Sequence, residues 1–580
     1  MKKLILFLLM WVASSTIASG QLLSPAPDPQ PPAPTLDLLI LHGRLYDGTG
    51  NPWRAADVGI RGGRIAALGK LAGASARRLL DARGMAVAPG FIDMHSHSDY
   101  ALLVDGRAEN RVRQGVTTEV FGEHISAAPL EGAAVPLLHQ WLAGLGGLTL
   151  KPDWTDFPGY FRRLERQGIS VNVASYVASG MVRAAVIGDQ NRPATPAELE
   201  RMRGMVETAM RQGALGLSSG LIYTPNRYAD VAELAALADV AARYGGIYAS
   251  HIRNEGAGYA EAVGEAVEIG RRARIPVHIF HFKLGGKSVW GRMAEQVKLI
   301  EAARAEGVEV TADQYPYTAG MTLLEIVIPP KYREGGQEKF LARLRDPAVR
   351  AAIRRDLAPE SKALALDGAG GVPGWESPSA VGWDRIMLAS ATRPENKPYE
   401  GRRISEIAAG RRQDPLDAVA DLLLSENSRC FAIYFQMDER DVTYAMRQPW
   451  VSVGSDGAAG PTAGKPHPRF YGAFPRLLGK YVREEKLLTL EEALRKMTSL
   501  AAQQAGLADR GLLRPGFAAD MVVFDPATVA DRATYENPEQ FPVGIEYVVV
   551  NGQLVVDRGR HTGARPGRVL RGPGYAAAGP

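Results

Sequence analysis

The central part of the chain alternates short apolar runs with longer stretches rich in Ala, Leu, Arg and Glu. Short continuous apolar runs are typical of strands buried on both faces, and longer amphipathic stretches are typical of helices. The apolar runs lie at residues 116–121, 171–176, 214–217, 247–250, 277–280, 308–312 and 451–453. The helical stretches include residues 196–212, 231–244 and 260–273. This order predicts an α/β fold of repeated strand–helix units around a parallel sheet.

Another apolar run, Met85-Ala-Val-Ala-Pro-Gly-Phe-Ile-Asp93, leads to the histidine pair His95 and His97. With this run the strands number eight, as in a (β/α)8 TIM-like barrel. The interval 323–380 is too long for one strand-to-helix connection, so we expect an inserted lid subdomain there. Two further apolar runs, at 385–388 and 431–435, have no place in this count.

The two ends of the folded region have a different pattern, in which short strands are separated by tight turns such as Asn551-Gly552. Short apolar runs bounded by glycine predict a sheet domain rather than strand–helix units. We therefore expect residues 36–89 and 508–565 to form one small β-sandwich domain. The barrel would then occupy residues 90–507.

The first 35 residues read as a targeting segment. Lys2 and Lys3 precede an apolar run over residues 4–12, which is followed by small residues up to Gly20. This is the pattern of a cleaved secretory signal, so we expect a signal peptide over residues 1–20 and a Pro-rich linker over 21–35. The apolar run is short for a membrane span and no cysteine follows it. We expect a periplasmic or secreted protein with no stable membrane anchor after cleavage.

Composition narrows the function classes. The 580 residues are 46% apolar and 23% charged, which is typical of a globular chain with a large core. The net charge of +5 comes from 68 basic and 63 acidic residues without basic runs, which argues against a nucleic-acid partner. Because Cys430 is the single cysteine, internal disulfides and cysteine-cluster metal sites are excluded.

Polar residues recur where the predicted strands end. His95 and His97 are two positions apart, so a strand would direct both imidazoles to one cation, although a polar loop could hold the same pair. The other strand ends carry Glu123, His251, His281 and Asp456. In (β/α)8 barrels the carboxyl ends of the strands carry the chemistry. Four of the ten histidines together with an aspartate at these ends indicate a transition-metal site.

Longer motifs accompany these residues. They are Gln114-Gly-Val-Thr-Thr, Gly220-Leu-Ile-Tyr-Thr-Pro, Ser250-His-Ile-Arg-Asn-Glu, Asp313-Gln-Tyr-Pro-Tyr-Thr-Ala-Gly, His467-Pro-Arg-Phe-Tyr-Gly, Lys480-Tyr-Val-Arg-Glu, Asp509-Arg-Gly and Arg514-Pro-Gly-Phe-Ala-Ala-Asp. From about Leu36 to His561 the chain thereby resembles the N-acyl-D-amino-acid deacylases (D-aminoacylases) of the amidohydrolase superfamily. The resemblance implies a barrel with a small sheet domain, one or two Zn²⁺ ions, and hydrolysis of the linear amide bond of N-acyl-D-amino acids. The products would be a D-amino acid and a carboxylate.

One position departs from the family. Better-known members carry a metal-ligating cysteine in the turn after the second barrel strand, where this chain reads Gly122-Glu123-His124. A carboxylate can ligate or bridge zinc as a thiolate does, so we transfer the role to Glu123, with His124 as the alternative one residue away. The carboxylated lysine of other superfamily members is not expected, because the fourth strand ends in Leu217-Ser-Ser-Gly220.

The resemblance also implies roles for other residues. Asp456 is placed to act as general base, although an aspartate after Gly-Ser can also cap a helix. The substrate carboxylate would need cationic and hydroxyl partners. The candidates are Lys283, Tyr315, Tyr223 and Arg253. For each of these, a surface ion pair or a packed tyrosine explains the sequence equally well.

Three other functions share parts of this pattern. A cyclic amidase of the hydantoinase type would use the same ligands, but the missing strand-4 lysine disfavours it. An exported dipeptidase acting on peptides with a C-terminal D-residue would differ only in the acyl group. An exported binding protein on a decayed enzyme scaffold would not need the complete ligand set, and metal content after purification would distinguish it.

Overall fold

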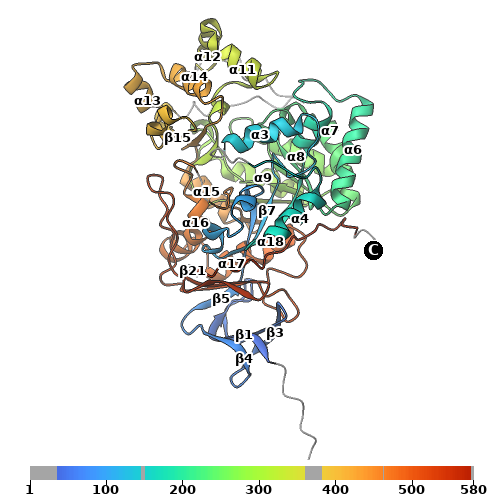
Figure 1. Cartoon of the computed structure of the whole chain (residues 1–580), viewed down its shortest axis with the longest axis vertical. Helices are drawn as coiled ribbons and strands as arrows, with labels where there is room; N and C mark the ends of the chain where they lie inside the picture. The colour runs from blue at the N-terminus through green and yellow to red at the C-terminus, as the bar shows by residue number, and fades with distance from the viewer. Residues whose placement is uncertain (1–34, 145–149, 359–381, 461–462, 577–580) are drawn as a thin grey trace, which may run out of the picture.

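The computed structural model describes residues 35–144, 150–358, 382–460 and 463–576. Figure 1 shows three parts stacked along the long axis of the molecule: a sheet domain at the lower end, a barrel in the middle, and an inserted subdomain at the top. The predicted signal peptide, and all but one residue of the linker, lie outside the described residues. Within them, each helix is too short or too polar to cross a membrane.

The sheet domain joins the two ends of the chain in one nine-stranded sheet, ordered β21-β20-β19-β18-β5-β1-β2-β3, with β4 paired to β1. Its strands are β1 (Leu36–Leu45), β2 (Arg54–Arg61), β3 (Arg64–Gly69), β4 (Ala76–Asp81), β5 (Ala86–Pro89), β18 (Met521–Phe524), β19 (Ile545–Val550), β20 (Gln553–Asp557) and β21 (Arg560–His561). The antiparallel pair β5–β18 connects the N-terminal and C-terminal halves, with Val87 opposite Val523. Both ends of the chain therefore build this domain, as the sequence predicts.

The barrel contains eight strand positions, and all its pairings are parallel. Its strands are β6 (Phe91–Ser96), β7 (Val116–Phe121), β8 (Asn172–Ser175) with β9 (Val177–Ala178) at the third position, β10 (Gly216–Gly220), β11 (Ile247–His251), β12 (Val277–Ile279), β13 (Val310–Gln314) and β17 (Val451–Val453). A bridge between Ser96 and Gly457 closes the ring at β6 and β17. This closed ring of parallel strands confirms the predicted α/β barrel. Almost all residues of these strands are buried, as a filled barrel interior requires.

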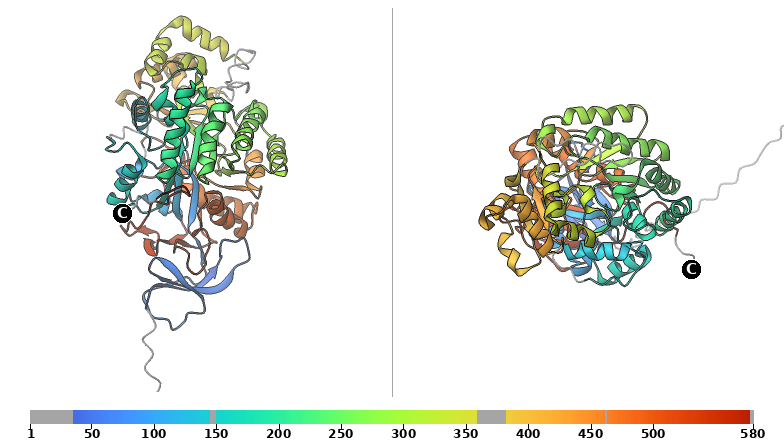
Figure 2. Two further views of the ribbon diagram at one scale, coloured as in Figure 1. Left: turned by 90° about the vertical axis from the view of Figure 1, so that its right-hand side faces the viewer. Right: turned by 90° about the horizontal axis from the view of Figure 1, so that it is seen from above.

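Helices cover the outside of the barrel, and in the right-hand view of Figure 2 they surround the strands. They are α1 (Ala101–Val104), α2 (Glu109–Val112), α3 (Ala134–Gly144), α4 (Phe157–Gln167), α5 (Ser179–Val186), α6 (Pro196–Arg211), α7 (Val231–Arg243), α8 (Tyr259–Ala273), α9 (Met293–Ala305), α15 (Glu439–Met446), α16 (Arg469–Arg476), α17 (Leu490–Met497) and α18 (Ser499–Gln504). Helix α6 begins as its sequence dictates: Thr195 and Glu198 form a capping box, and Pro196 occupies the first turn.

The inserted subdomain lies between β13 and β17 and is wider than the predicted interval 323–380. It contains an antiparallel sheet ordered β14-β16-β15, made of β14 (Gly320–Leu323), β15 (Ile386–Ser390) and β16 (Phe431–Tyr434). Its helices are α10 (Pro330–Arg333), α11 (Gln337–Arg345), α12 (Pro347–Asp356), α13 (Ile404–Arg411) and α14 (Pro415–Ser425). The two apolar runs without a place in the barrel are β15 and β16, whose partners lie far away in sequence.

The insertion has an apolar core of its own and still contacts the barrel. The hydroxyls of Tyr223, in the loop after β10, and Thr322, in β14, are 2.8 Å apart and hydrogen-bonded. Helix α3 adds Trp141, whose ring meets Phe431 edge-on with centroids 5.7 Å apart. The antiparallel sheet of the insertion is thus fixed above the carboxyl ends of the barrel strands.

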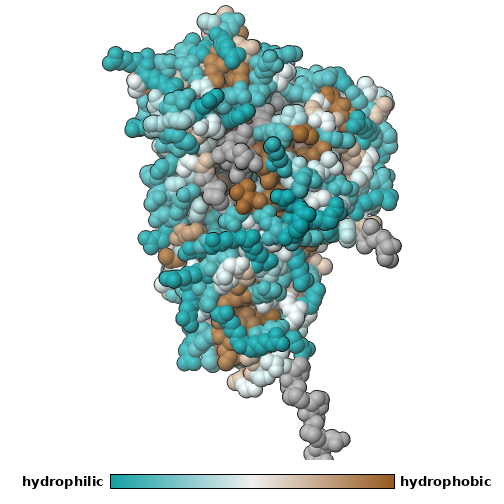
Figure 3. All heavy atoms as spheres, viewed as in Figure 1, coloured by the Kyte–Doolittle hydropathy of each residue, from teal (hydrophilic) through white to brown (hydrophobic). Residues whose placement is uncertain are grey.

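The face of the molecule shown in Figure 3 is mainly hydrophilic, with small apolar patches.

Candidate metal centre

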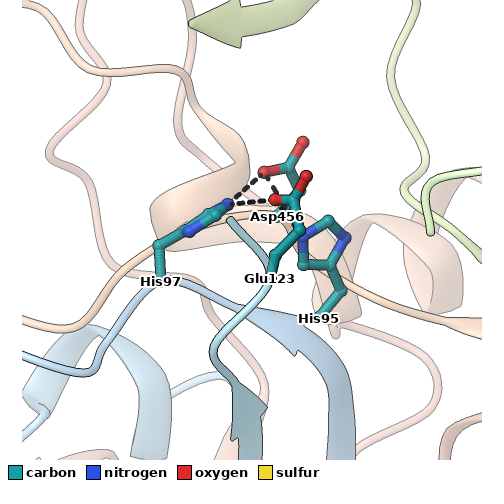
Figure 4. A group of neighbouring side chains, drawn as sticks. All are labelled: His95, His97, Glu123 and Asp456. Atoms are coloured by element: carbon teal, nitrogen blue, oxygen red, sulfur yellow. Dashed lines mark hydrogen bonds and ion pairs between the residues drawn. The ribbon is translucent and has the colours of Figure 1, made fainter. Parts of the chain in front are cut away.

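The first group of metal-binding side chains comes from β6, β7 and the loop after β17. His95 lies in β6 and His97 directly follows it, and their rings converge on two carboxylates (Figure 4). The His95 Nε2 atom is 3.0 Å from Glu123 Oε2, and His97 Nε2 is 3.1 Å from the same oxygen. His97 Nε2 is also 3.0 Å from Asp456 Oδ1. The four residues form one donor cluster that can hold a cation.

The second group shares Glu123 with the first. The other oxygen of this carboxylate, Oε1, lies 2.8 Å from His251 Nδ1 and 3.9 Å from His281 Nε2. The two imidazole nitrogens are themselves 2.8 Å apart. One oxygen of Glu123 therefore faces each donor group, and this carboxylate would contribute one donor atom to each group when metal is bound.

Several observations show that these donors fit a metal ion. Glu123 Oε1 is buried and has no hydrogen-bond partner, although two imidazoles face it. His95 and Glu123 are 1% and 3% exposed, so solvent does not satisfy them. His281 and Asp456 have φ angles of +37° and +49°, a backbone region that costs energy for residues other than glycine. Buried imidazole and carboxylate donors of this kind suit zinc and neighbouring transition metals.

The electrostatics keep both carboxylates ionised. Burial alone would raise the pKa of Glu123, but the imidazoles of His251, His95 and His97 that face its two oxygens hold this pKa well below its usual value. Burial likewise opposes the charge on Asp456, and the nearby Arg469 is the main group that lowers its pKa. Asp456 is therefore ionised at neutral pH, the form in which a carboxylate can accept a proton.

His124, the alternative ligand, belongs to neither donor group. Its ring packs against Tyr223 with centroids 4.3 Å apart, and it meets Trp141 edge-on at 5.7 Å. Burial lowers the pKa of His124 to about 3, which keeps the imidazole neutral. In this structure Glu123 supplies the donor oxygens, and His124 packs beside the turn.

Of the four residues predicted to bind the substrate carboxylate, two have polar groups beside the donor groups and two have polar groups bonded elsewhere. Lys283 Nζ is bound to Glu255 and lies 2.8 Å from His281 Nδ1, next to the donor groups. The Tyr315 hydroxyl is buried without a hydrogen-bond partner, close to the same cavity. Lys283 and Tyr315 therefore come together, as expected for a carboxylate site.

Tyr223 and Arg253 also line this cavity, but their polar groups are engaged elsewhere. The Tyr223 hydroxyl contacts Thr322 of the insertion. The guanidinium of Arg253 is 2.7 Å from Glu265 and also donates to two backbone carbonyls, so it holds the loop rather than facing a ligand.

Arg469 is a functional candidate that the sequence reasoning did not single out. It lies at the start of α16, its guanidinium Nη1 is 2.9 Å from Asp456 Oδ2, and its side chain is 2% exposed. The guanidinium also lies over the Tyr315 ring, 4.8 Å from the centroid. Arg469 belongs to the motif His467-Pro-Arg-Phe-Tyr-Gly, which is the sequence feature that could have indicated a functional role. The distance of Arg469 from Asp456 along the chain does not show where its side chain points.

Apart from His95 and His124, these candidate residues line one cavity with about 1090 Å³ of empty space, part of it open to solvent. Small-molecule sites typically measure about 300–1,000 Å³, so this partly open cavity is of that order. The floor carries the metal donors and Asp456, and one side carries Lys283, Tyr315 and Arg469. The lining residues that come from the inserted subdomain are uncharged, and Met321, Ile326 and Phe431 among them are apolar. A ligand that combines a carboxylate with less polar groups fits this division.

A family model for the amidohydrolase family matches residues 78–355 and 379–556. The chain therefore belongs to the amidohydrolase family. Within it, the chain is 38% identical to a D-aminoacylase of Alcaligenes xylosoxydans xylosoxydans, an alignment that covers 92% of this chain and 97% of the relative. It is 39% identical to an N-acyl-D-glutamate deacylase of the same organism, over 94% and 98% of the two chains.

Solved structures agree with this placement. An N-acyl-D-glutamate deacylase from Bordetella bronchiseptica, complexed with zinc and a phosphonate mimic of the tetrahedral intermediate, matches with a TM-score of 0.78 at 38% identity. The match covers 93% of this chain and all of that chain. A D-aminoacylase structure matches with a TM-score of 0.76 at 37% identity, over 92% of this chain. The predicted family is thus confirmed.

The shared carboxylate can be tested directly. We expect Glu123→Gln to lower the metal content of the purified protein markedly, because it removes a charged donor and keeps the shape of the side chain. Glu123→Cys should recover part of the metal and become sensitive to peroxide. Elemental analysis of each variant, alongside turnover, is the measurement.

His124→Ala is the matched control, because it alters the adjacent residue of the same turn. It should retain the metal if His124 only packs beside the site. Full metal content in Glu123→Gln together with loss of metal in His124→Ala would contradict the assignment of the turn ligand.

Proposed function

We propose that the protein is a zinc-dependent hydrolase that cleaves the linear amide bond of N-acyl-D-amino acids. The observation that carries this proposal is the position of Glu123, whose two oxygens face two donor groups. Asp456 and the side chains of Lys283, Tyr315 and Arg469 line the same cavity as Glu123. The relatives named as D-aminoacylase and N-acyl-D-glutamate deacylase support it. One or two ions would be held by His95, His97, Glu123, His251 and His281.

The chain's own residues perform the remaining steps. Bound zinc would activate a water and polarise the amide carbonyl. Asp456 accepts the proton of the attacking water and then delivers it to the leaving nitrogen, while Arg469 holds its carboxylate in place. Lys283 and Arg469 can bind the substrate carboxylate, and the Tyr315 hydroxyl is free to donate a hydrogen bond to it.

The related cyclic-amidase reaction is less well supported. Superfamily members that use a carboxylated lysine would carry it at the end of the fourth barrel strand. There β10 presents Ser218 and Ser219, and Ser218 donates a 2.8 Å hydrogen bond to the Glu123 carbonyl. Ser219 lies 2.9 Å from Ser250 on the next strand. Ser218 therefore supports the Glu123 turn, and Glu123 belongs to both donor groups.

The proposal also includes export, because residues 1–20 have the pattern of a secretory signal and residues 21–35 form a Pro-rich spacer. We expect the full-length chain to be recovered from the periplasm or medium with its N-terminus near residue 21. N-terminal sequencing of the mature protein and fractionation of a chain lacking residues 2–20 are the measurements. Equal recovery of both forms from the cytoplasm would contradict export.

Stereochemistry tests the substrate class. A metal centre and a carboxylate clamp fix two points of the substrate, so only one enantiomer can direct its side chain into the cavity. We expect hydrolysis of N-acetyl-D-amino acids, with their L-enantiomers at least about 10²-fold slower, a ratio that a mismatched pocket readily reaches. Turnover of both series, together with L-Xaa-D-Xaa dipeptides, is measured on zinc-loaded enzyme. Equal rates for both enantiomers would contradict the proposal.

The general base gives a separate test. Asp456→Asn should retain zinc and the fold but lose turnover by roughly 10² to 10⁴, the range typical of general acid–base groups. The amide cannot accept the proton of the attacking water, yet it keeps the size of the side chain. Metal content and circular dichroism serve as controls. Near-native turnover in a metal-replete variant would remove Asp456 from the mechanism.

A further inference from the structure

The roof of the cavity, which faces the metal donors from above, is built by the inserted subdomain. It is formed by Met321, Thr322, Ile326, Phe431, Tyr434 and Gln436. None of these six side chains carries a charge. Trp141 extends the apolar surface by packing edge-on against Phe431 at 5.7 Å. The part of the cavity away from the metal is therefore apolar or neutral over the residues that the structure describes.

The basic side chains that line the cavity, within the described ranges, are Arg253, Lys283 and Arg469, and each already has an anionic partner. Arg253 is bound by Glu265 at 2.7 Å, Lys283 by Glu255, and Arg469 by Asp456 at 2.9 Å. One substrate carboxylate can be shared by Lys283 and Arg469 on their side of the cavity. A second carboxylate in the substrate would find no further cation among the described residues of this cavity.

The next cation, Arg333, does not fill that role. It lines two neighbouring cavities behind Tyr223, and its Nη1 lies 4.0 Å from Glu325. Tyr223 and Trp141 line both the metal-site cavity and one of these two cavities, so they form a wall between that cavity and the metal site. A short side chain such as that of aspartate or glutamate, held near the metal, would meet this aromatic wall.

Sequence identity does not decide which D-amino acid is bound. The chain is 38% identical to a D-aminoacylase, 39% to an N-acyl-D-glutamate deacylase and 38% to an N-acyl-D-aspartate deacylase. These identities do not distinguish the three substrate classes. The lack of a further cation among the described residues of the cavity does distinguish them. An ionised side chain buried without a partner is strongly disfavoured relative to its solvated state.

We infer that the substrates are N-acyl-D-amino acids whose side chains are uncharged and apolar, aliphatic, thioether or aromatic. This inference rests on the proposed function and names its substrate class. Met321 and Phe431 form the contact surface for that side chain or for an apolar acyl group, and they act as specificity-determining residues. The single carboxylate of such a substrate is the one that Lys283 and Arg469 receive.

The test compares kcat/KM of the zinc-loaded enzyme for the N-acetyl derivatives of D-Leu, D-Met and D-Phe with those of D-Glu and D-Asp. The apolar group should exceed the acidic group by at least about 10²-fold. N-acetyl-D-Gln, which matches D-Glu in size without its charge, should fall between the two. An acidic substrate within tenfold of D-Leu would overturn the inference and leave the proposed function intact. No hydrolysis of any of them would overturn both.

A charge placed in the roof gives an independent measurement. Met321→Lys should raise the ratio of kcat/KM for D-Glu over D-Leu by about tenfold or more, because it supplies the missing cation. Met321→Gln is the matched control, since it adds polarity and similar length without charge, and it should leave that ratio within about threefold of the original. An equal ratio for Met321→Lys and Met321→Gln would show that this roof position does not contact the substrate side chain.

Discussion

The junction between β6 and β17 is the constraint on which the site depends. The backbone N–H of Asp456 donates to the carbonyl of His95, and that of His97 donates to Gly457, both at 2.7 Å. Beneath them a buried ion cluster joins the two elements. The Asp93 carboxylate accepts from the backbone N–H of Ser455 at 2.8 Å, and the fully buried Arg111 contacts Asp93, Ser455 and Glu119. Since buried charges are stable only when paired, this cluster fixes ligands and base in one unit.

The carboxylate at the turn after β7 gives this metal centre its particular chemistry. Glu123 offers one oxygen to each donor group, whereas a bridging thiolate would offer a single sulfur atom to both. An oxygen donor is harder than sulfur and does not oxidise, which is compatible with the proposed export to an oxidising compartment. The chain's single cysteine, Cys430, is buried in the insertion, far from this turn in sequence.

The fold separates reaction chemistry from substrate selection. Barrel strand ends supply the metal donors and Lys283, and these positions are fixed by parallel pairing around the ring. The roof comes from an insertion with its own apolar core, which can vary without disturbing the metal donors. Tyr223 and Trp141 connect the two parts, through the hydrogen bond to Thr322 and the contact with Phe431. This division accounts for how closely related chains can act on different D-amino acids.

The sequence by itself determined the barrel, the two-ended sheet domain and the histidine donors, and it left the turn ligand open between Glu123 and His124. Apolar runs mark buried strands, and parallel strands in a barrel bring their carboxyl ends together, so His95, His251 and His281 could be placed at one site. The tertiary structure decided the rest. The boundaries of the insertion depend on the pairing of β14 and β15 with the distant β16. The orientation of Arg469 toward Asp456, and of Arg253 toward Glu265, depends on long side chains whose direction no spacing reveals, because it is set by partners brought close only by folding.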